Sequence, residues 1–310
     1  MLKKLFCIAT LAVIVTLSGC QSAQDVSTTT TSTSTTATST TTTASTTSTT
    51  IAGDNFSVYF IDVGQGDSIL IKTKDSHYVL IDSGPSDASN GLNTFLNSKG
   101  VASIYRAILT HTHADHYGEF KDVVGNYTIS GFMFANYPNT NSTYVSLMNK
   151  LATSSIPTIE VKDGDSFTLD NLTFRFYHPP AGFISTSSDE NDNSLAIKVS
   201  NQSGVDLLDC GDLETAGMSS LLSRHSGDVD IELLKVNHHG SSNGTNQALL
   251  TATTPTDAFI CVGAGNSYGH PEAATLSLLS SNSINVYRTD SNGDITVNVN
   301  GGSYSVATEK

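Results

Sequence analysis

The chain has 310 residues, and its 15 Lys and Arg against 29 Asp and Glu give a formal net charge of −14 at pH 7. This acidic balance argues against a protein that binds nucleic acid through bulk electrostatic attraction, because such binding needs a basic surface. The length allows one large domain besides terminal segments. Of the four cysteines, Cys210 and Cys261 each end an apolar strand-like run. We expect buried free thiols there, and a disulfide between them remains an alternative.

Residues 1–20 have the features of an export signal. Lys3 and Lys4 precede an apolar stretch, and the segment closes on Leu-Ser-Gly-Cys at 17–20. The stretch is too short and wrongly flanked for an ordinary membrane-spanning helix. Its end resembles the bacterial lipobox, which implies that Cys20 is lipidated and anchors the chain to the outer face of the cell membrane. A plain secretory signal or an uncleaved anchor is the alternative.

Residues 21–52 are predicted to be a disordered linker. Between positions 27 and 50, 22 of 24 residues are Ser or Thr, so this segment has no apolar surface to bury. We expect it to hold the following domain, residues 53–310, away from the membrane.

The domain at 53–310 alternates strand and helix patterns along the chain. We expect strands at 56–61, 68–73, 77–81, 105–109, 129–134, 157–161, 166–169, 171–177, 194–200, 205–209, 230–236 and 257–262. We expect helices at 89–99 (capped by Ser89), 115–124, 142–153, 213–223, 245–252 and 271–281. A closing hairpin is expected over 284–307, with turns at 292–293 and 300–301. Two such halves fit an α/β (α+β) domain of four layers, with two packed sheets between helices.

The segment THTHADHYG at 110–118 predicts a metal site. It follows an apolar strand, and it places His111, His113, Asp115 and His116 within six positions. Imidazole nitrogens and carboxylate oxygens suit zinc, manganese or iron. In an extended segment the first two histidines point to the same side and could hold one ion, while Asp115 and His116 could hold a second.

Other polar residues follow or precede predicted strands in the same way. In α/β folds ligands bind beyond the carboxyl ends of strands, so these residues are candidates for the same site. They are Asp82 in LIDSG, Asn191, Asp192 and Ser194 in NDNSL, Asp212 in LLDCGD, His238 and His239 in NHHGSS, and His270 in GNSYGHP.

These motifs, together with FIDVGQGDSILI at 60–71, resemble the metallo-β-lactamase-fold hydrolases. Within that group the combination resembles the domain at the end of the competence DNA-channel protein ComEC, over essentially all of residues 54–310. The resemblance implies an αββα sandwich with one or two divalent ions, Zn or Mn, at the sheet edges. It also implies that Asp212 bridges the ions, and that Asp82 orients a ligand histidine.

The resemblance leaves several roles open. We favour His238 as the remaining ligand of the second ion, with His239 and His270 lining the cleft as acid or substrate contact. Asn191 or Asp192 occupies the place where many members have a further histidine, and His178 in FYHPP is a possible substitute. Asp67 in DVGQGDS and Tyr268 in SYGHP are further candidates for ligand or substrate contact.

The expected reaction is hydrolysis of a phosphodiester by water that the ions activate. The attacking hydroxide would be hydrogen-bonded to Asp115 or Asp212, and His239 or His270 would protonate the leaving group. The resemblance favours a nucleic acid as substrate, whereas the acidic balance favours a smaller diester such as a choline-phosphate ester of the cell wall. A lactonase or β-lactamase-like enzyme and a non-catalytic surface binding protein are the other two classes.

Overall fold

The computed structural model describes residues 53–87 and 91–310. The predicted signal segment, the Ser/Thr-rich linker and the cap residue Ser89 lie outside the described residues. None of the helices in these two ranges has the length and apolar character that a membrane span requires.

The first large sheet has eight strands in the order β17-β16-β1-β2-β3-β5-β7-β8. They are β1 (Asn55–Phe60), β2 (Ile69–Lys72), β3 (Tyr78–Ile81), β5 (Arg106–Leu109), β7 (Phe132–Phe134), β8 (Thr158–Glu160), β16 (Ile295–Asn300) and β17 (Ser303–Thr308). β3, β5, β7 and β8 pair in parallel. β4 (Ser103–Ile104) and β6 (Thr128–Ile129) form a separate small sheet.

The second large sheet has seven strands in the order β15-β14-β13-β12-β11-β10-β9. They are β9 (Ser166–Leu169), β10 (Leu172–His178), β11 (Ala196–Ser200), β12 (Asp206–Asp209), β13 (Leu233–Lys235), β14 (Asp257–Ile260) and β15 (Asn285–Arg288). β12 to β15 pair in parallel, so their carboxyl ends meet at one edge.

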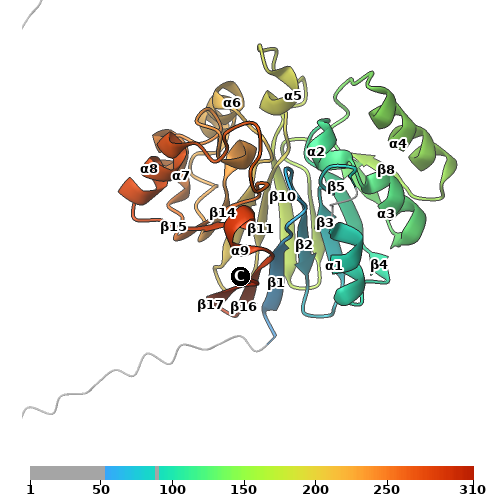
Figure 1. Cartoon of the computed structure of the whole chain (residues 1–310), viewed down its shortest axis with the longest axis horizontal. Helices are drawn as coiled ribbons and strands as arrows, with labels where there is room; N and C mark the ends of the chain where they lie inside the picture. The colour runs from blue at the N-terminus through green and yellow to red at the C-terminus, as the bar shows by residue number, and fades with distance from the viewer. Residues whose placement is uncertain (1–52, 88–90) are drawn as a thin grey trace, which may run out of the picture. The chain divides into compact units, whose positions relative to one another are not determined.

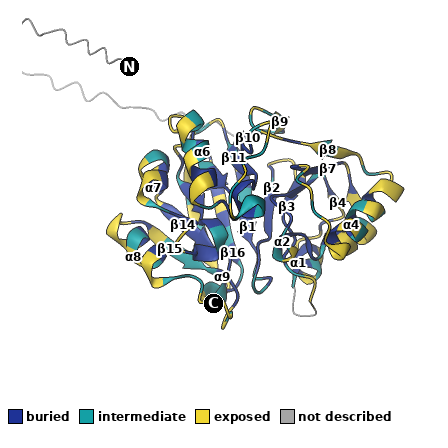
Figure 2. Ribbon diagram, turned by 90° about the horizontal axis from the view of Figure 1, so that it is seen from above, coloured by how far each residue is buried: buried dark blue, intermediate teal, exposed yellow. Residues whose placement is uncertain are grey.

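Helices cover the outer face of each sheet, and the apolar side chains fall into three clusters. α1 (Leu92–Ser98), α3 (Phe120–Asn126) and α4 (Ser142–Thr153) cover the first sheet, and α6 (Thr215–His225), α7 (Gln247–Thr253) and α8 (Ala273–Ser281) cover the second (Figure 1). Between the sheets, Phe60 stacks on Phe259 with ring centroids 4.3 Å apart. The expected four-layer αββα fold is therefore confirmed, and Figure 2 shows exposed residues on the outer helices and buried ones in the sheets.

The C-terminal segment corrects one prediction. The expected hairpin over 284–307 is instead divided between the sheets, because β15 joins the second sheet while β16 and β17 form a hairpin in the first. The turn at 300–301 joins that hairpin. Asn292 instead ends the short helix α9 (Thr289–Asn292), and Gly293 follows it with φ 65°. A strand pattern in the sequence does not say which sheet the strand will join.

Two shorter helices also differ from the expectation. The helix expected at 115–124 is broken into α2 (Ala114–Tyr117) and α3. An unpredicted short helix, α5 (Asp189–Asp192), precedes β11. Both α2 and α5 lie at the strand ends where the polar motifs collect, so both bear on the site.

Candidate metal centre

The turn after β5 brings the two histidines of the HxH pattern side by side. His113 is extended, with φ −86° and ψ 150°, immediately before α2. His111 Nε2 consequently lies 3.0 Å from His113 Nδ1. This is close to the spacing of two nitrogen ligands that are each about 2.0–2.1 Å from one ion.

Asp212, after β12 of the other sheet, lies between the Nε2 atoms of His111, His116 and His239. Its Oδ2 is 3.3 Å from His116 Nε2, 3.4 Å from His239 Nε2 and 3.8 Å from His111 Nε2. Its side chain is only 2% exposed. Gly211 allows this approach, because a Cβ at that position would lie 2.9 Å from the Thr110 side chain.

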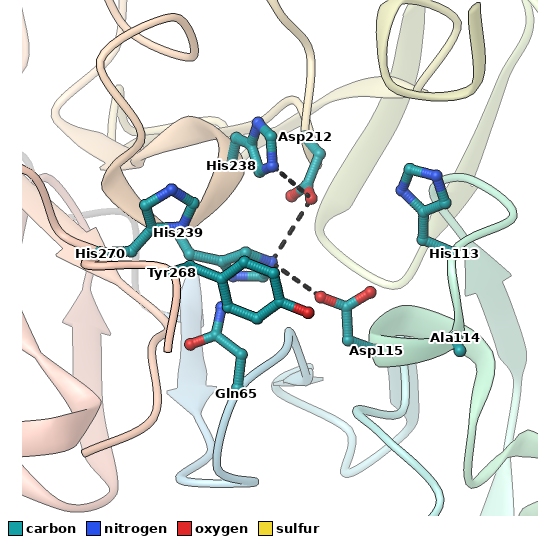
Figure 3. A pocket seen from close by; sticks show the side chains of 9 residues that line it. All are labelled: Gln65, His113, Ala114, Asp115, Asp212, His238, His239, Tyr268 and His270. Atoms are coloured by element: carbon teal, nitrogen blue, oxygen red, sulfur yellow. Dashed lines mark ion pairs between the residues drawn. The ribbon is translucent and has the colours of Figure 1, made fainter. Parts of the chain in front are cut away.

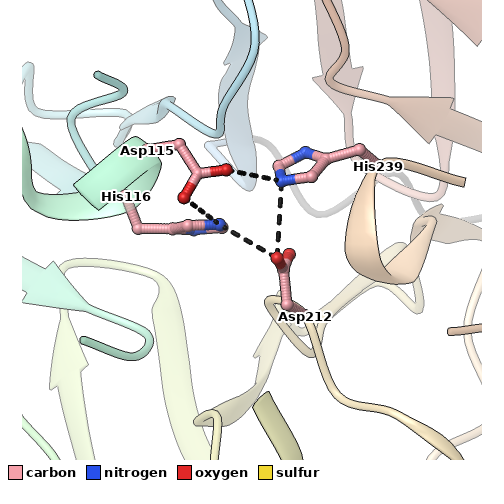
Figure 4. A group of neighbouring side chains, drawn as sticks. All are labelled: Asp115, His116, Asp212 and His239. Carbon is pink, nitrogen blue, oxygen red and sulfur yellow. Dashed lines mark ion pairs between the residues drawn. The ribbon is translucent and has the colours of Figure 1, made fainter. Parts of the chain in front are cut away.

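Two ligand groups share this carboxylate. The first ligand group is His111, His113 and Asp212, and the second ligand group is Asp115, His116, Asp212 and His239 (Figure 4). Within each group one ligand atom per residue lies within 4.8 Å of every other. Asp115 closes the second group, with Oδ2 3.3 Å from His239 Nε2. The sequence-predicted residues of the THTHADH turn and Asp212 are thus brought together.

Hydrogen bonds and an ion pair behind the second ligand group fix the two imidazole rings. His116 Nδ1 lies 2.7 Å from Asp82 Oδ2, and Asp82 also accepts from the backbone N–H of Thr110 at 2.8 Å. His239 Nδ1 lies 2.9 Å from the carbonyl oxygen of Cys261 and 3.1 Å from Asp67 Oδ1. Each ring can therefore present only its Nε2 to the site.

Unpartnered buried atoms show that these residues fit a divalent ion. Among the described residues, His116 Nε2, His239 Nε2 and Asp212 Oδ1 are buried and have no hydrogen-bond partner. A buried polar atom without a partner costs about 1–3 kcal/mol. Since all three atoms belong to the second ligand group, a bound ion would satisfy them together.

Charges in the site support the same conclusion. Burial opposes charge on the His116 ring, but Asp212 and Asp82 together raise its pKa well above the usual value. Burial likewise opposes charge on Asp212, yet His239 and His116 hold its pKa well below the usual value. The buried carboxylates thus favour positive charge beside them, which a divalent ion would supply.

The structure places His239, not the expected His238, in the second ligand group. The turn Asn237–Gly240 has left-handed backbone at both histidines, with φ 49° at His238 and 52° at His239. His239 is buried and aims Nε2 between the two aspartates, whereas His238 is 21% exposed and its Nε2 lies 3.8 Å from Asp212. The sequence could not distinguish adjacent histidines, because the choice depends on two left-handed φ angles.

Two glutamates that the sequence analysis did not single out lie beside histidines of the site. Glu190 Oε2 lies 2.7 Å from His113 Nε2. Glu214 Oε1 lies 3.3 Å from His238 Nδ1 and accepts from Asn191 Nδ2 at 2.8 Å. Glu190 immediately precedes NDNS, and Glu214 follows Asp212 by two positions. Proximity to those motifs was the only signal that the sequence offered.

Asp192 and His178, which the sequence offered in place of a further histidine ligand, lie outside both ligand groups. Asp192 accepts from the N–H of Gly217 at 2.8 Å and from Thr186 Oγ1 at 2.7 Å, so it binds the first turn of α6. His178 directs Nδ1 to the carbonyl oxygen of Ser194 at 3.0 Å, and it belongs to neither ligand group. The structure does not bring His178 together with the other candidate ligands, because its ring is buried beside β11.

A cavity of about 370 Å³ opens over the ligand groups (Figure 3). It is lined by Gln65, His113, Ala114, Asp115, Asp212, His238, His239, Tyr268 and His270. Tyr268 is 68% exposed and stacks on His270, with centroids 5.8 Å apart. Burial and the neighbouring His238 lower the pKa of His270. The expected substrate contacts Tyr268 and His270 therefore form one wall of the cavity.

Comparisons with known proteins agree with this fold. Residues 61–183 match the model of the metallo-beta-lactamase superfamily. CmlA, a diiron beta-hydroxylase from Streptomyces venezuelae, has a similar structure, with a TM-score of 0.53 and 11% identity over 82% of this chain and 54% of CmlA. That likeness concerns the fold.

Two curated relatives are similar in sequence. ComE operon protein 3 of Bacillus subtilis is 29% identical over 259 residues, which is 77% of this chain and 32% of that protein. Competence protein ComA of Neisseria gonorrhoeae is 29% identical over 75% of this chain and 30% of its own length. The chain thus spans about a third of the length of these relatives. It contains a metallo-β-lactamase domain related to those of ComEC-like competence proteins, with the fold of a metal-dependent hydrolase of that superfamily and two candidate metal-ligand groups.

Proposed function

We propose that the protein is a metal-dependent phosphodiesterase that acts outside the cell while anchored by lipidated Cys20. The observation that carries the proposal is the pair of ligand groups that share Asp212 at the floor of an open cavity. Two adjacent ions suit the hydrolysis of a phosphodiester, because they can stabilise both the attacking and the leaving oxygen.

Each ligand group offers a site for one ion. His111, His113 and Asp212 would hold one, and Asp115, His116, His239 and Asp212 the other. Zn or Mn suits this mixture of imidazole and carboxylate ligands. When bound, such ions make water a stronger nucleophile near neutral pH and neutralise charge that develops on the phosphoryl group.

Side chains of the cavity would handle the proton and orient the substrate. His238 lines the cavity; its Nδ1 lies 3.3 Å from Glu214 Oε1 and its Nε2 3.8 Å from Asp212 Oδ2. A histidine held from behind by a carboxylate is suited to protonate a leaving oxygen. We assign this role to His238 rather than to His239, whose Nε2 faces the two aspartates of the second ligand group.

The cavity favours a small or terminal diester over a long duplex. Of the residues that line it in the described ranges, none is Lys or Arg, whereas Asp115 and Asp212 both carry negative charge. A track for a polyanion would need basic residues. The exposed ring of Tyr268 offers a surface on which a nucleobase or another planar group could stack. The candidates are a nucleic-acid end, which the competence relatives favour, and a small cell-wall diester such as a choline-phosphate ester.

Hydrolysis assays test the proposal. The purified protein, stripped with a chelator and reloaded with Mn or Zn, should cleave bis-(p-nitrophenyl) phosphate. His111→Ala and Asp212→Asn should each lower kcat/KM by at least about 100-fold. His77→Ala, at an exposed histidine, is the matched control and should behave as wild type. Equal turnover by wild type and both ligand variants would rule the proposal out.

Parallel substrates separate the alternatives. The same ions could act on a carbonyl, so a lactone and a β-lactam belong in the assay beside single-stranded DNA and a choline-phosphate ester. Turnover of the lactone or β-lactam alone would replace the proposed reaction. Metal binding without turnover of any of these compounds would favour a non-catalytic binding protein.

The location is tested independently. The full chain expressed in a bacterium should be found in the membrane fraction, and Cys20→Ser should release it. Recovery of both forms in the same fraction would contradict anchoring through Cys20 and leave the hydrolase proposal untouched.

A further inference from the structure

A lysine lies fully buried beneath the candidate metal centre. Lys235, the last residue of β13, has 0% exposure. Lysine is almost never fully buried unless it is paired. Its Nζ forms an ion pair with Asp67 and donates to the carbonyl oxygen of Gly211 at 3.2 Å. Lys235 does not line the cavity, so these neighbours carry its contacts with the site, while its charge also attracts Asp212.

Asp67 carries the connection to the ligand histidines. It is 1% exposed, and its Oδ1 lies 3.1 Å from His239 Nδ1. Its Oδ2, which pairs with Lys235, lies 3.7 Å from His116 Nδ1. The Asp67 backbone N–H also donates to the carbonyl oxygen of Asp115 at 3.2 Å. Asp67 therefore contacts three members of the second ligand group, His239 and His116 through its carboxylate and Asp115 through its backbone N–H.

The second contact of Lys235 leads to the shared ligand. Gly211, whose carbonyl oxygen accepts from Nζ, directly precedes Asp212. The backbone N–H of Gly211 is in turn held by Asp209 Oδ1 at 2.9 Å. The ammonium thus joins the loop after β1, in the first sheet, to the loop after β12, in the second.

We propose that Lys235 is a positioning residue of the metal centre, which fixes the Asp67 carboxylate and through it the imidazole of His239. With Nδ1 held by Asp67 and Cys261, His239 can direct only Nε2 to the ion of the second ligand group. Loss of the ammonium frees Asp67 to rotate or to change its partner, and His239 then loses one of its two anchors. Asp67 makes no hydrogen bond to His111 or His113 of the first ligand group. Because the Gly211 contact reaches Asp212, which both groups share, both ions feel the change, but the larger effect falls on the second ion. This inference rests on the metal site of the proposed function but not on the reaction.

Cobalt binding measures this effect without a substrate. Co(II) in place of the native ion gives an absorption spectrum that reports ligand number and geometry, and titration followed by mass spectrometry gives the affinity of each ion. Lys235→Met keeps the length and apolar stem of the side chain but removes the charge. Lys198→Met is the matched control, because Lys198 pairs with Asp206 at 2.9 Å on the neighbouring strands β11 and β12 and has no contact with the ligand groups.

We expect Lys235→Met to weaken the second Co(II) ion about 10- to 100-fold and to change its spectrum. The first ion should bind within a few-fold of wild type, and Lys198→Met should leave both ions unchanged. Equal weakening of both ions, or no change in either, would overturn the proposal. Because neither readout involves hydrolysis, an inactive enzyme with these metal-binding results would contradict only the proposed function.

A double variant covers the case in which Lys235→Met folds poorly. Asp67→Asn leaves a buried ammonium without its anion, and Lys235→Met leaves a buried carboxylate without its cation. Removing both charges should give a protein more stable towards urea than either single variant. In the Asp67→Asn background, Lys235→Met should also add little further loss of affinity for the second ion. Additive losses of stability and of affinity would show that Lys235 does not act through Asp67.

Discussion

At the scale of single residues, His178 shows how burial rather than metal binding can fix a histidine. Its ring has no exposure, and burial lowers its pKa to about 4. A histidine whose folded pKa lies below its unfolded value favours the folded state when neutral, so this stability is present above about pH 6.5. It is lost as the pH falls from about 6.5 to 4, because His178 in the unfolded chain then binds a proton whereas His178 in the folded chain stays neutral.

We expect His178→Gln to flatten this part of the stability curve. Gln can still donate to the Ser194 carbonyl oxygen but does not titrate. The free energy of unfolding of wild type should fall by about 3 kcal/mol more than that of the variant between pH 6.5 and 4. Urea unfolding at several pH values, with chelator present in both samples, measures the difference. Parallel curves would show that His178 contributes nothing to the pH dependence.

The adjacent histidines His238 and His239 give a second prediction at the residue scale. His239→Ala should weaken the second ion at least about 10-fold, because it removes a ligand. His238→Ala should leave metal stoichiometry unchanged and lower kcat, most strongly for substrates with poor leaving groups, because it removes the proton donor. Mass spectrometry of bound metal and a series of phenyl phosphodiesters provide the measurements. If His238→Ala loses the metal while His239→Ala keeps it, the two roles are the reverse of those proposed.

At the scale of elements, the short helix α2 packs closely against the loop at 84–86, and this packing requires a glycine directly after the helix. Gly118 follows α2 with ordinary helical backbone, φ −53°. A Cβ there would lie 2.2 Å from the backbone nitrogen of Ser86 and 2.5 Å from the carbonyl carbon of Pro85. The atoms that a Cβ would meet belong to the backbone, so no flexible side chain can move aside. Glycine is therefore required at position 118 by lack of space and not by an unusual backbone conformation.

Gly118→Ala should therefore displace α2, and with it His116. We expect a loss of about 1–3 kcal/mol in the free energy of unfolding, typical of overpacking, and weaker binding of the second ion. Gly227→Ala is the matched control, since a Cβ at that position meets nothing within 4 Å. Urea unfolding and metal titration of both variants test this. If the two variants had the same stability and metal affinity, the loop at 84–86 would have to move to accommodate the Cβ without loss of stability.

At the scale of the whole domain, the metal centre joins the two sheets. His111, His113, Asp115 and His116 follow β5 of the first sheet, whereas Asp212 and His239 follow β12 and β13 of the second. An ion bound in either ligand group holds both sheets, and the unfolded chain cannot reproduce that arrangement. Metal binding should therefore stabilise the domain by mass action.

The expected effect is a rise in Tm with metal concentration. At 100 times Kd, one site adds about 2.7 kcal/mol, which corresponds to roughly 5–10 °C for a domain of this size. Asp212→Asn, which weakens both ligand groups, should abolish most of the rise. Scanning fluorimetry across a metal series in wild type and Asp212→Asn measures it. A rise of the same size in both proteins would place the stabilising metal outside the proposed centre.

The amino-acid sequence by itself determined the elements and the strand ends at which the site lies. Apolar runs of strand length followed by polar residues predicted most strands, and helix α4 has the bounds that the sequence predicted. Four candidate ligands come from one turn, and their spacing alone brings His111 and His113 together. Such local features are readable because they depend on neighbours along the chain.

The tertiary structure decided which residues from distant strands complete the site. The choice of His239 over His238 depends on left-handed backbone at two non-glycine residues, for which the sequence has no local signal. The contacts of Glu190 with His113 and of Lys235 with Asp67 join residues 77 and 168 positions apart. A buried lysine in a sequence looks like any strand-end lysine. Only the packing of two sheets removes it from water and supplies the carboxylate that makes its burial possible.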